Sequence, residues 1–457
     1  MADVAALLGE IVGPEHVLTG GRIAEDYGHD EALGAEPQLP VAVVLPASTD
    51  DVASVLRLAT EQGVPVTARG SGTGLSGAAR PRSGGLVVSF ERMNAVLEID
   101  TANQVAVVQP GVTLAQLDEI TAKHGLVYPV YPGEYSASLG GNVGTNAGGM
   151  RAVKYGVTRH QVLGIEAVLA GGDVIRTGGR FVKGSTGYDL TQLIIGSEGT
   201  LALVTEAILR LYPRPDHRAT VLAPFTTLDA VMAAVPLVVA SGVGPLILEY
   251  IDMLTMKGME RQFGLDLGVP ADVQEAAFAY LVVALENTHE ARVEEDVEAV
   301  ATQLTELGAI DVYVLPPGAA TSLIEAREKA FFLAKASGAD DIVDVVVPRA
   351  AIPAYLARIG ELAKEYGALV AGCGHAGDGN VHLSVFQPDE DQRHEIMRSI
   401  FRTGMDMGGA ISGEHGIGTE KKRYFLELED PAKVALMRRI KLAFDPNGIL
   451  SPGKLFD

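Results

Sequence analysis

Cysteine is nearly absent from this chain of 457 residues, which contains only Cys373. One cysteine cannot form an internal disulfide, and it cannot supply the thiolates of an iron-sulfur cluster. Any iron-sulfur relay would therefore belong to another subunit. Long apolar runs are missing too: no window reaches roughly 18 uninterrupted apolar residues, so we expect no helix that spans a membrane.

Basic residues are also scarce, with 36 Lys and Arg against 58 Asp and Glu and a net charge of −22. Such a surface repels nucleic acid and anionic lipid, so we expect no nucleic-acid partner. A small anionic substrate could still bind where a few cationic groups are focused in a cleft. The N-terminal segment MADVAALLGEIV has neither a basic region nor a long apolar run, so we expect no signal or transit peptide and a cytoplasmic location.

The chain is too long for one ordinary core, and its length predicts two or three domains. The first half alternates short strands and helices, beginning with a β-α-β unit formed by residues 41–46, 50–62 and 64–70. Later in this half, residues 127–150 are rich in Gly, Pro, Ser and Asn and predict a long loop. A loop of that length in a compact domain is usually functional or disordered.

Longer strands and helices begin after residue 213 and predict an antiparallel sheet with helices on one face. The fold class is therefore α+β. We predict a first domain over residues 1–214, a second over 215–425 and a C-terminal segment, 426–457, that packs back on the first.

Three glycine-rich segments in the first half could approach a phosphate or a planar ring closely: ARGSGTGLSGAA (68–79), SLGGNVGTNAGG (138–149) and GSEGT (196–200). The first lacks the Gly-Lys-Ser/Thr of a Walker A loop. It also fails the dinucleotide fingerprint, because its glycines open no periodic helix. The alternative is that all three are tight turns without a ligand.

A histidine-rich constellation marks the second half. GHAGDGNVH (374–382) predicts a hairpin that brings His375 and His382 side by side, and Glu414 is the natural third ligand of a divalent metal. His415 is then the candidate base. The alternatives are a hairpin with two incidental histidines and a surface imidazole at His415.

In combination, these motifs closely resemble the FAD-linked 2-hydroxyacid dehydrogenases, which include D-lactate and D-2-hydroxyglutarate dehydrogenases and the glycolate oxidase flavin subunit. The resemblance rests on the three glycine-rich segments, KGSTGYDL, GHAGDGNVH, GGAISGEHGIGTEKK and FDPNGILSPGK, and extends from about Pro40 to the last residues.

The resemblance implies a vanillyl-alcohol oxidase/PCMH-type FAD-binding domain of two α+β subdomains and a substrate domain with the metal site. The segment Arg69 to Gly77 would hold the pyrophosphate, and the other two loops would line the rest of the FAD. The expected cofactor contacts are Arg69, Gly70, Ser71, Gly72, Thr73, Gly74, Leu75, Ser76, Gly77, Ser138, Leu139, Gly141, Asn142, Thr145, Asn146, Gly148, Gly149, Glu198, Gly199 and Asn380. Relatives that bind the flavin covalently carry a His in the first glycine-rich loop or a Cys in the second. This chain has neither residue in those loops, so we predict that FAD is bound non-covalently.

The family resemblance also favours zinc or manganese as the metal, although imidazole ligands suit iron as well. It places Arg327 as the group that binds the substrate carboxylate; the alternative is an exposed helical Arg paired with Glu325 or Glu328. Ile342 and Ser384 stand where hydroxyglutarate-type members carry Lys and Asn, so a monocarboxylate such as D-lactate is favoured over D-2-hydroxyglutarate; glycolate stays open.

The expected reaction is oxidation of a D-2-hydroxy acid to the 2-oxo acid, with hydride transfer to flavin N5. The electron acceptor is open among an iron-sulfur subunit, an electron-transfer flavoprotein, a quinone and oxygen, and a membrane association would run through that partner. A homodimer is also open. Two rivals are an ether-lipid synthase-like flavoenzyme, which would need more cationic residues in its second domain, and a non-catalytic flavin- and metal-binding subunit.

Overall fold

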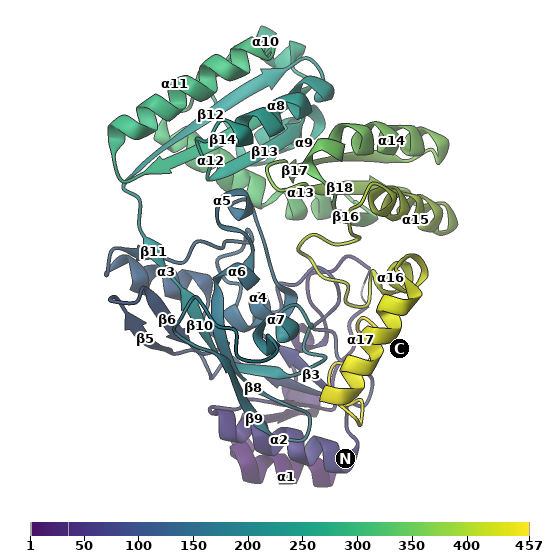
Figure 1. The fold of residues 1–457 in the computed structure, drawn as a ribbon. Helices are drawn as coiled ribbons and strands as arrows, with labels where there is room; N and C mark the ends of the chain where they lie inside the picture. Colours follow the sequence, from purple (N-terminus) through teal and green to yellow (C-terminus); the bar gives the residue numbers. More distant parts are fainter. Residues whose placement is uncertain (1, 35, 457) are drawn as a thin grey trace.

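Two small sheets form the N-terminal part of the computed structural model, which describes residues 2–34 and 36–456. The first has the order β1-β2-β4-β3, and its strands β2, β3 and β4 are parallel. Its apolar side chains pack with helices α1 and α2 at the lower end of the molecule (Figure 1). The bounds are α1 Ala2–Val12, β1 Val17–Thr19, β2 Ala42–Val44, α2 Thr49–Gln62, β3 Val66–Arg69 and β4 Leu86–Ser89.

The second sheet is antiparallel, with the order β5-β6-β10-β8-β9. Its core is shared with α3 and α4, and β7 pairs with β11 in a separate two-stranded ribbon, directly before the first strand of the next sheet. The bounds are β5 Val96–Asp100, β6 Val105–Val108, α3 Leu114–Ala122, β7 Leu126–Val127, α4 Leu139–Thr145, α5 Ala152–Tyr155, α6 Thr158–Gln161, β8 Val162–Val168, β9 Val174–Gly178, α7 Leu190–Ile194, β10 Leu203–Arg210 and β11 Tyr212–Pro213.

The segment predicted as a long loop, residues 127–150, contains the helix α4, so that expectation needs correction. Ser138 caps the helix by accepting from the Gly141 N–H, and Asn146 ends it in the left-handed conformation. Glycine lowers the helix propensity of this stretch, but Leu139 and Val143 are fully buried in the core. Capping and tertiary packing therefore override the composition.

The third sheet is antiparallel throughout, with the order β15-β12-β14-β13-β17-β18-β16. It forms the upper part of the molecule in Figure 1. The bounds are β12 His217–Phe225, α8 Leu228–Ala240, β13 Ile247–Asp252, α9 Met253–Phe263, α10 Ala271–Ala276, β14 Ala279–Asn287, α11 Glu290–Glu306, β15 Tyr313–Val314, α12 Pro317–Glu328, α13 Ala330–Ala336, β16 Asp341–Val346, α14 Ile352–Glu365, β17 Leu369–His375, β18 Asn380–Phe386 and α15 Glu390–Asp406.

Helices cover both faces of this sheet, whereas the sequence predicted helices on one face only. The helices α8, α11, α14 and α15 pack on one face, as expected. The helices α9 and α12 pack on the other, against Leu222, Tyr280 and Val282. Successive residues of β12 and β14 therefore enter opposite cores, which explains why these strands are continuously apolar rather than alternating.

The C-terminal residues return to the N-terminal part. After α16 (Lys422–Leu428), the helix α17 (Pro431–Phe444) descends from the third sheet toward the first (Figure 1). Leu450 bridges to Val66 at the end of the first sheet, and both are buried in its core. The domain boundaries at residues 214 and 425 stay predictions.

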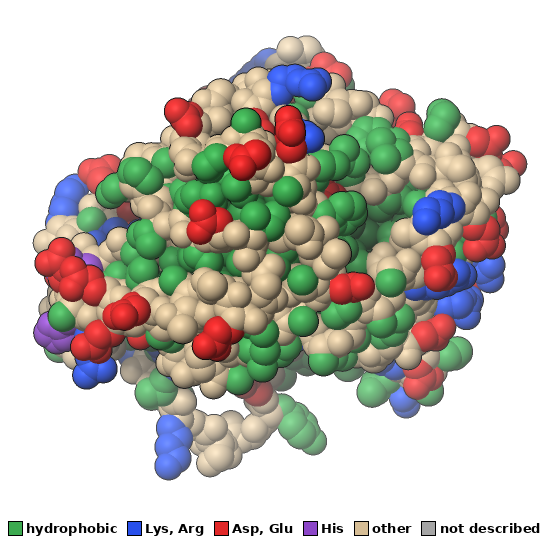
Figure 2. All heavy atoms as spheres, turned by 90° about the horizontal axis from the view of Figure 1, so that it is seen from above, with side chains coloured by type: hydrophobic (Ala, Val, Ile, Leu, Met, Phe, Trp, Pro, Cys, Tyr) green, Lys and Arg blue, Asp and Glu red, His purple; other side chains and the backbone are tan. Residues whose placement is uncertain are grey.

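On the upper face of the molecule (Figure 2), the described acidic side chains do not gather into one patch. Seen from above, acidic side chains are spread over the face in Figure 2, with Lys and Arg between them. Among the described helices, none is both long and apolar enough to cross a lipid bilayer.

Candidate active site

The predicted hairpin is present and brings the two histidines together. His375 is the last residue of β17, and His382 lies on the adjacent strand, opposite Cys373. The two imidazole rings are 4.8 Å apart, at 78° to each other. The tight turn between the strands therefore gives two nitrogen donors on one face of the sheet.

Glu414 joins these histidines from a distant part of the chain. Its Oε1 lies 3.2 Å from Nε2 of both His375 and His382. The segment before it is attached to β16, where Gly413 donates its N–H to the Asp344 carbonyl. Two imidazoles and one carboxylate whose ligand atoms lie within 4.8 Å of one another are a suitable donor set for a divalent metal.

The carboxylates and imidazoles of this cluster stabilise one another's charged forms against the cost of burial. Burial alone would raise the pKa of Glu414, but the neighbouring His375 and His382 lower it well below its usual value. Burial alone would lower the pKa of His375, but the carboxylates of Glu249 and Glu414 raise it well above its usual value.

Glu249 is a buried partner of this cluster that the sequence analysis did not find. Its Oε1 is 2.6 Å from Nδ1 of His375, so it fixes the orientation of that ring and leaves Nε2 toward Glu414. Its Oε2 lies 2.7 Å from Nη2 of Arg327, as an ion pair rather than a hydrogen bond. Burial alone would raise the pKa of Glu249, but His375 and Arg327 lower it below its usual value. The signal in the sequence was the position of Glu249 itself, an acidic residue within the apolar strand β13.

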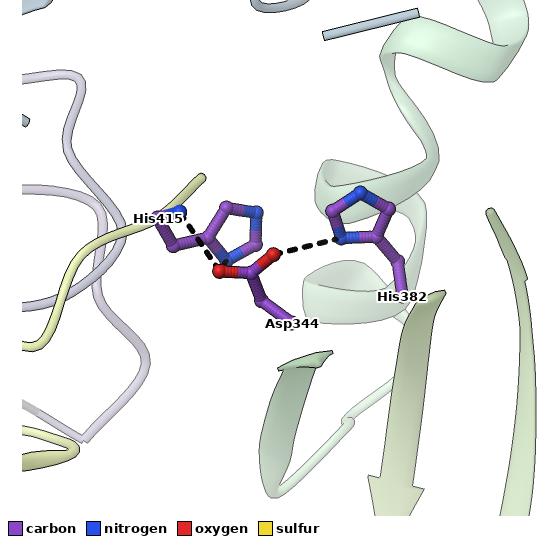
Figure 3. A group of neighbouring side chains, drawn as sticks. All are labelled: Asp344, His382 and His415. Carbon is purple, nitrogen blue, oxygen red and sulfur yellow. Dashed lines mark hydrogen bonds and ion pairs between the residues drawn. The ribbon is translucent and has the colours of Figure 1, made fainter. Parts of the chain in front are cut away.

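Asp344, on β16, is a second missed carboxylate and lies between His382 and His415 (Figure 3). It is fully buried, and it accepts hydrogen bonds from the Ser412 hydroxyl, the Asn380 amide and the His415 backbone N–H. Burial alone would raise its pKa, but the neighbouring His415, Lys421 and His382 lower the pKa to about 2. Asp344 therefore organises the loop that carries Glu414 and His415.

His415 stacks on His382, with ring centres 5.1 Å apart. Its Nδ1 is 3.9 Å from Asp344 Oδ2. Burial lowers the pKa of His415 to about 4, against the opposing charge of Asp344. The alternative of a surface imidazole does not fit, because this side chain is mostly buried and lines two cavities.

The first cavity, of about 200 Å³, lies among the glycine-rich loops. A side chain at Gly70 would clash with Ser138, so the two loops approach each other closely there. The Asn142 amide Nδ2 is buried without a hydrogen-bond partner. The lining includes most of the predicted cofactor contacts: Arg69, Gly70, Ser71, Gly72, Thr73, Gly74, Leu75, Ser76, Ser138, Gly141, Asn142, Thr145, Gly148, Glu198 and Gly199. A cradle with close backbone approaches and an unpaired amide fits a polar, planar cofactor.

Other predicted cofactor contacts lie outside the lining of this cavity. The Leu139 side chain is in the core, and Asn146 accepts from the Arg159 N–H. Asn380 donates to Asp344, and Gly77 faces Thr419. Gly149 lines the second cavity instead.

Glu198 connects the third glycine-rich loop to the loop of His415. Its carboxylate accepts from the N–H groups of Ile417 and Gly418, both at 2.7 Å. Gly148 approaches from the other side, since a Cβ there would lie 2.6 Å from Glu414 Oε2. The glycine-rich loops therefore help to place the predicted metal ligand and base.

The second cavity, of about 280 Å³, extends from the histidine cluster between α9, α13 and the third sheet. Arg327 lines it from α12, and its buried Nε has no hydrogen-bond partner among the described residues. The exposed alternative for Arg327 is therefore wrong. The two cavities meet at four shared residues: Leu75, Pro132, Glu414 and His415.

Comparison with known families identifies the cofactor of this chain as FAD. Residues 214–455 match the model of the C-terminal domain of FAD linked oxidases, and residues 40–178 match the FAD binding domain. The chain belongs to the family of FAD-linked oxidases. It is an FAD-linked oxidoreductase related to the 2-hydroxyacid dehydrogenases, as the motifs predicted.

Curated relatives match this FAD-linked oxidoreductase over 90% of its length or more. An uncharacterized FAD-linked oxidoreductase of Mycobacterium tuberculosis is 60% identical over 456 residues, which cover 100% of this chain and 99% of the relative. The D-lactate dehydrogenase of Archaeoglobus fulgidus is 40% identical over 90% of both chains.

A solved structure supports the fold. The 4-ethylphenol oxidase of Gulosibacter chungangensis superposes with a TM-score of 0.78 at 19% identity, covering 100% of this chain and 97% of the oxidase. The PCMH-type fold predicted from the motifs is thereby confirmed.

Proposed function

We propose that this oxidoreductase oxidises a D-2-hydroxy monocarboxylic acid to the 2-oxo acid. The observation that carries the proposal is the meeting of the two cavities at Glu414 and His415. A substrate held there would face the cofactor cavity on one side and the histidine cluster on the other. The name of the archaeal relative, a D-lactate dehydrogenase, favours the same substrate class.

Three residues would hold the metal, namely His375, His382 and Glu414. When bound, FAD accepts the two electrons of the oxidation as a hydride, and a divalent ion such as Zn²⁺, Mn²⁺ or Fe²⁺ lowers the pKa of a hydroxyl group. Glu249 supports this set by holding Nδ1 of His375. The metal itself is part of the proposal.

Arg327 would bind the substrate carboxylate. Its side chain lines the second cavity beside the histidine cluster, and a guanidinium can donate to both oxygens of a carboxylate. His415 would accept the hydroxyl proton as C2 loses its hydride. Its place at the junction of the two cavities, held by the hydrogen bond of its backbone N–H to Asp344, supports this role.

The second cavity favours a monocarboxylate over D-2-hydroxyglutarate. Arg327 is the only Lys or Arg among the described residues that line it, so a second carboxylate would lack a cationic partner. Ile342 and Ser384 do line it, next to each other on β16 and β18. Glycolate stays an alternative, because it also carries a single carboxylate.

An anaerobic titration with D-lactate, D-2-hydroxyglutarate and glycolate, followed at the flavin absorption band, tests the proposal. We expect a monocarboxylate to bleach the flavin and D-2-hydroxyglutarate to bleach it much more slowly. Bound FAD that no 2-hydroxy acid bleaches would instead support a non-catalytic subunit.

Non-covalent binding of FAD, a cytoplasmic location and a homodimer stay predictions. Acid precipitation tests the first: non-covalent FAD is released into the supernatant, whereas covalent FAD stays with the precipitated protein. The acceptor of the electrons stays open among an iron-sulfur subunit, an electron-transfer flavoprotein, a quinone and oxygen.

A further inference from the structure

The second cavity changes character along its length. At one end are the histidine cluster and Arg327; at the other, the walls come from α9, α13 and three strands of the third sheet. The register of these strands shows how the change arises. Asp344 is opposite His382, and two residues away Ile342 is opposite Ser384. The same face of the sheet therefore changes from charged side chains to an apolar one along these strands.

The apolar floor extends well beyond the reacting end. Leu369 pairs with Phe386, four residues along β18 from His382, or about 13 Å at the rise of an extended strand. Across from this floor, Leu254 and Gly258 of α9 and Leu333 of α13 form the opposite wall. A substrate whose side chain is only a methyl group would leave most of these apolar walls in contact with water.

Polar partners for a substrate side chain are few in this part of the cavity. The hydroxyls of Thr255, Ser337 and Ser384 are there, and Thr255 already donates to the Gly372 carbonyl. The described lining residues include no Lys, Asn or Gln. Leu254 and Leu369 remain 49% and 54% exposed, which places apolar side chains where the cavity opens to solvent.

We infer that the substrate is a 2-hydroxy acid with an apolar side chain of about four or more carbons, such as D-2-hydroxyisocaproate or D-2-hydroxyoctanoate. This inference rests on the proposed function, and it names the substrate class that the same site selects. Each buried methylene contributes about a fourfold gain, so three carbons more than lactate should raise kcat/KM by roughly 60-fold.

The experiment compares anaerobic flavin reduction by glycolate, D-lactate, D-2-hydroxyisocaproate, D-2-hydroxyoctanoate and D-2-hydroxyglutarate. We expect the rate at low substrate concentration to increase with the length of the apolar chain. If glycolate, D-lactate or D-2-hydroxyglutarate reduces the flavin as efficiently as the longer acids, the inference is overturned while the proposed function stands.

Gly258→Val tests the position of the apolar side chain. A Cβ at Gly258 would lie 3.1 Å from Leu333 Cδ2, so the larger residue fills the far end of the cavity. The ratio of kcat/KM for D-2-hydroxyoctanoate over D-lactate should fall about tenfold or more. Gly360→Val is the matched control: it makes the same change in a helix where nothing lies within 4 Å, and it should leave the ratio unchanged.

A second variant and a binding measurement cover the remaining outcomes. If Gly258→Val does not fold, Ala371→Leu fills the same cavity from β17 and should lower the same ratio. If no acid reduces the flavin, the proposed function fails, and calorimetry with 2-oxooctanoate and pyruvate on the FAD-bound protein still decides the inference. Tighter binding of 2-oxooctanoate supports it, and equal affinities overturn it.

Discussion

Two buried carboxylates, Glu249 and Asp344, shape the site although neither is a proposed metal ligand. Glu249 holds the ring of His375, and Asp344 gathers the backbone and side-chain donors of the loop that bears His415. A buried carboxylate is costly unless it is paired, so both positions depend on their partners.

Glu249→Gln should lower the affinity for the divalent metal about 10- to 100-fold, because a neutral amide orients and polarises His375 less well. Titration of the metal against a competing chelator measures the affinity. Glu286→Gln is the control: Glu286 is also a buried glutamate of the third sheet, paired with Lys154 and Arg218 instead. Equal affinities in wild type and Glu249→Gln would contradict the role of Glu249.

His415→Ala should lower turnover by about 10²-fold or more while FAD stays bound, because the proton of the substrate hydroxyl then has no positioned acceptor. Turnover and the flavin content of the purified protein are the two measurements. His394→Ala changes a histidine of α15 that contacts Tyr424 of α16, and it should leave turnover unchanged. Near-normal turnover of His415→Ala would refute its assignment as the base.

At the scale of elements, the hairpin of β17 and β18 was predictable because its glycine-rich turn lies between two short apolar runs. The helix α4 was not, because its glycines favour a loop and its stability comes from Ser138 and the surrounding core. The second layer of helices on the third sheet was also missed. The local pattern of α9 and α12 does not specify which face of the sheet they cover.

Gly379, in the hairpin turn, has φ +96° and no room for a Cβ, which would clash with the Val347 carbonyl. Gly379→Ala should therefore lower the free energy of unfolding by about 2–4 kcal/mol and displace His382. Gly367→Ala, at φ +60° with nothing within 4 Å, should lower it by only about 1 kcal/mol.

Urea unfolding followed by tyrosine fluorescence measures this difference, since the chain has 13 Tyr and no Trp. Equal midpoints for the two glycine variants would show that the turn tolerates a side chain at Gly379.

At the scale of the whole molecule, the C-terminal segment connects distant parts of the chain. Lys454 donates to the Arg80 carbonyl at 2.6 Å, and the charged groups facing it are Asp30, Arg80, Glu198 and Lys422. Burial lowers the pKa of Lys454 from 10.5 to about 8, and Asp30 opposes this shift. The folded state therefore binds fewer protons than the unfolded state between these two values.

The contribution of Lys454 to the free energy of unfolding should thus increase as pH rises from about 8 to about 10, since stability rises with pH where the unfolded state binds more protons. Lys454→Met removes this titration. Urea unfolding of both proteins across this pH range should show the wild type gaining stability relative to the variant. Parallel curves would contradict the lowered pKa.

The family, the FAD-binding fold and the hairpin could all be predicted from the amino-acid sequence, because these depend on glycine spacing and on residues close together in the chain. The sequence also named His375, His382, Glu414 and Arg327 as candidates. Only the tertiary structure joined Glu414 to the hairpin and brought Glu249 beside His375 and Arg327. It also decided the apolar cavity, because its walls come from elements far apart in sequence and no local pattern fixes which side chains face one space.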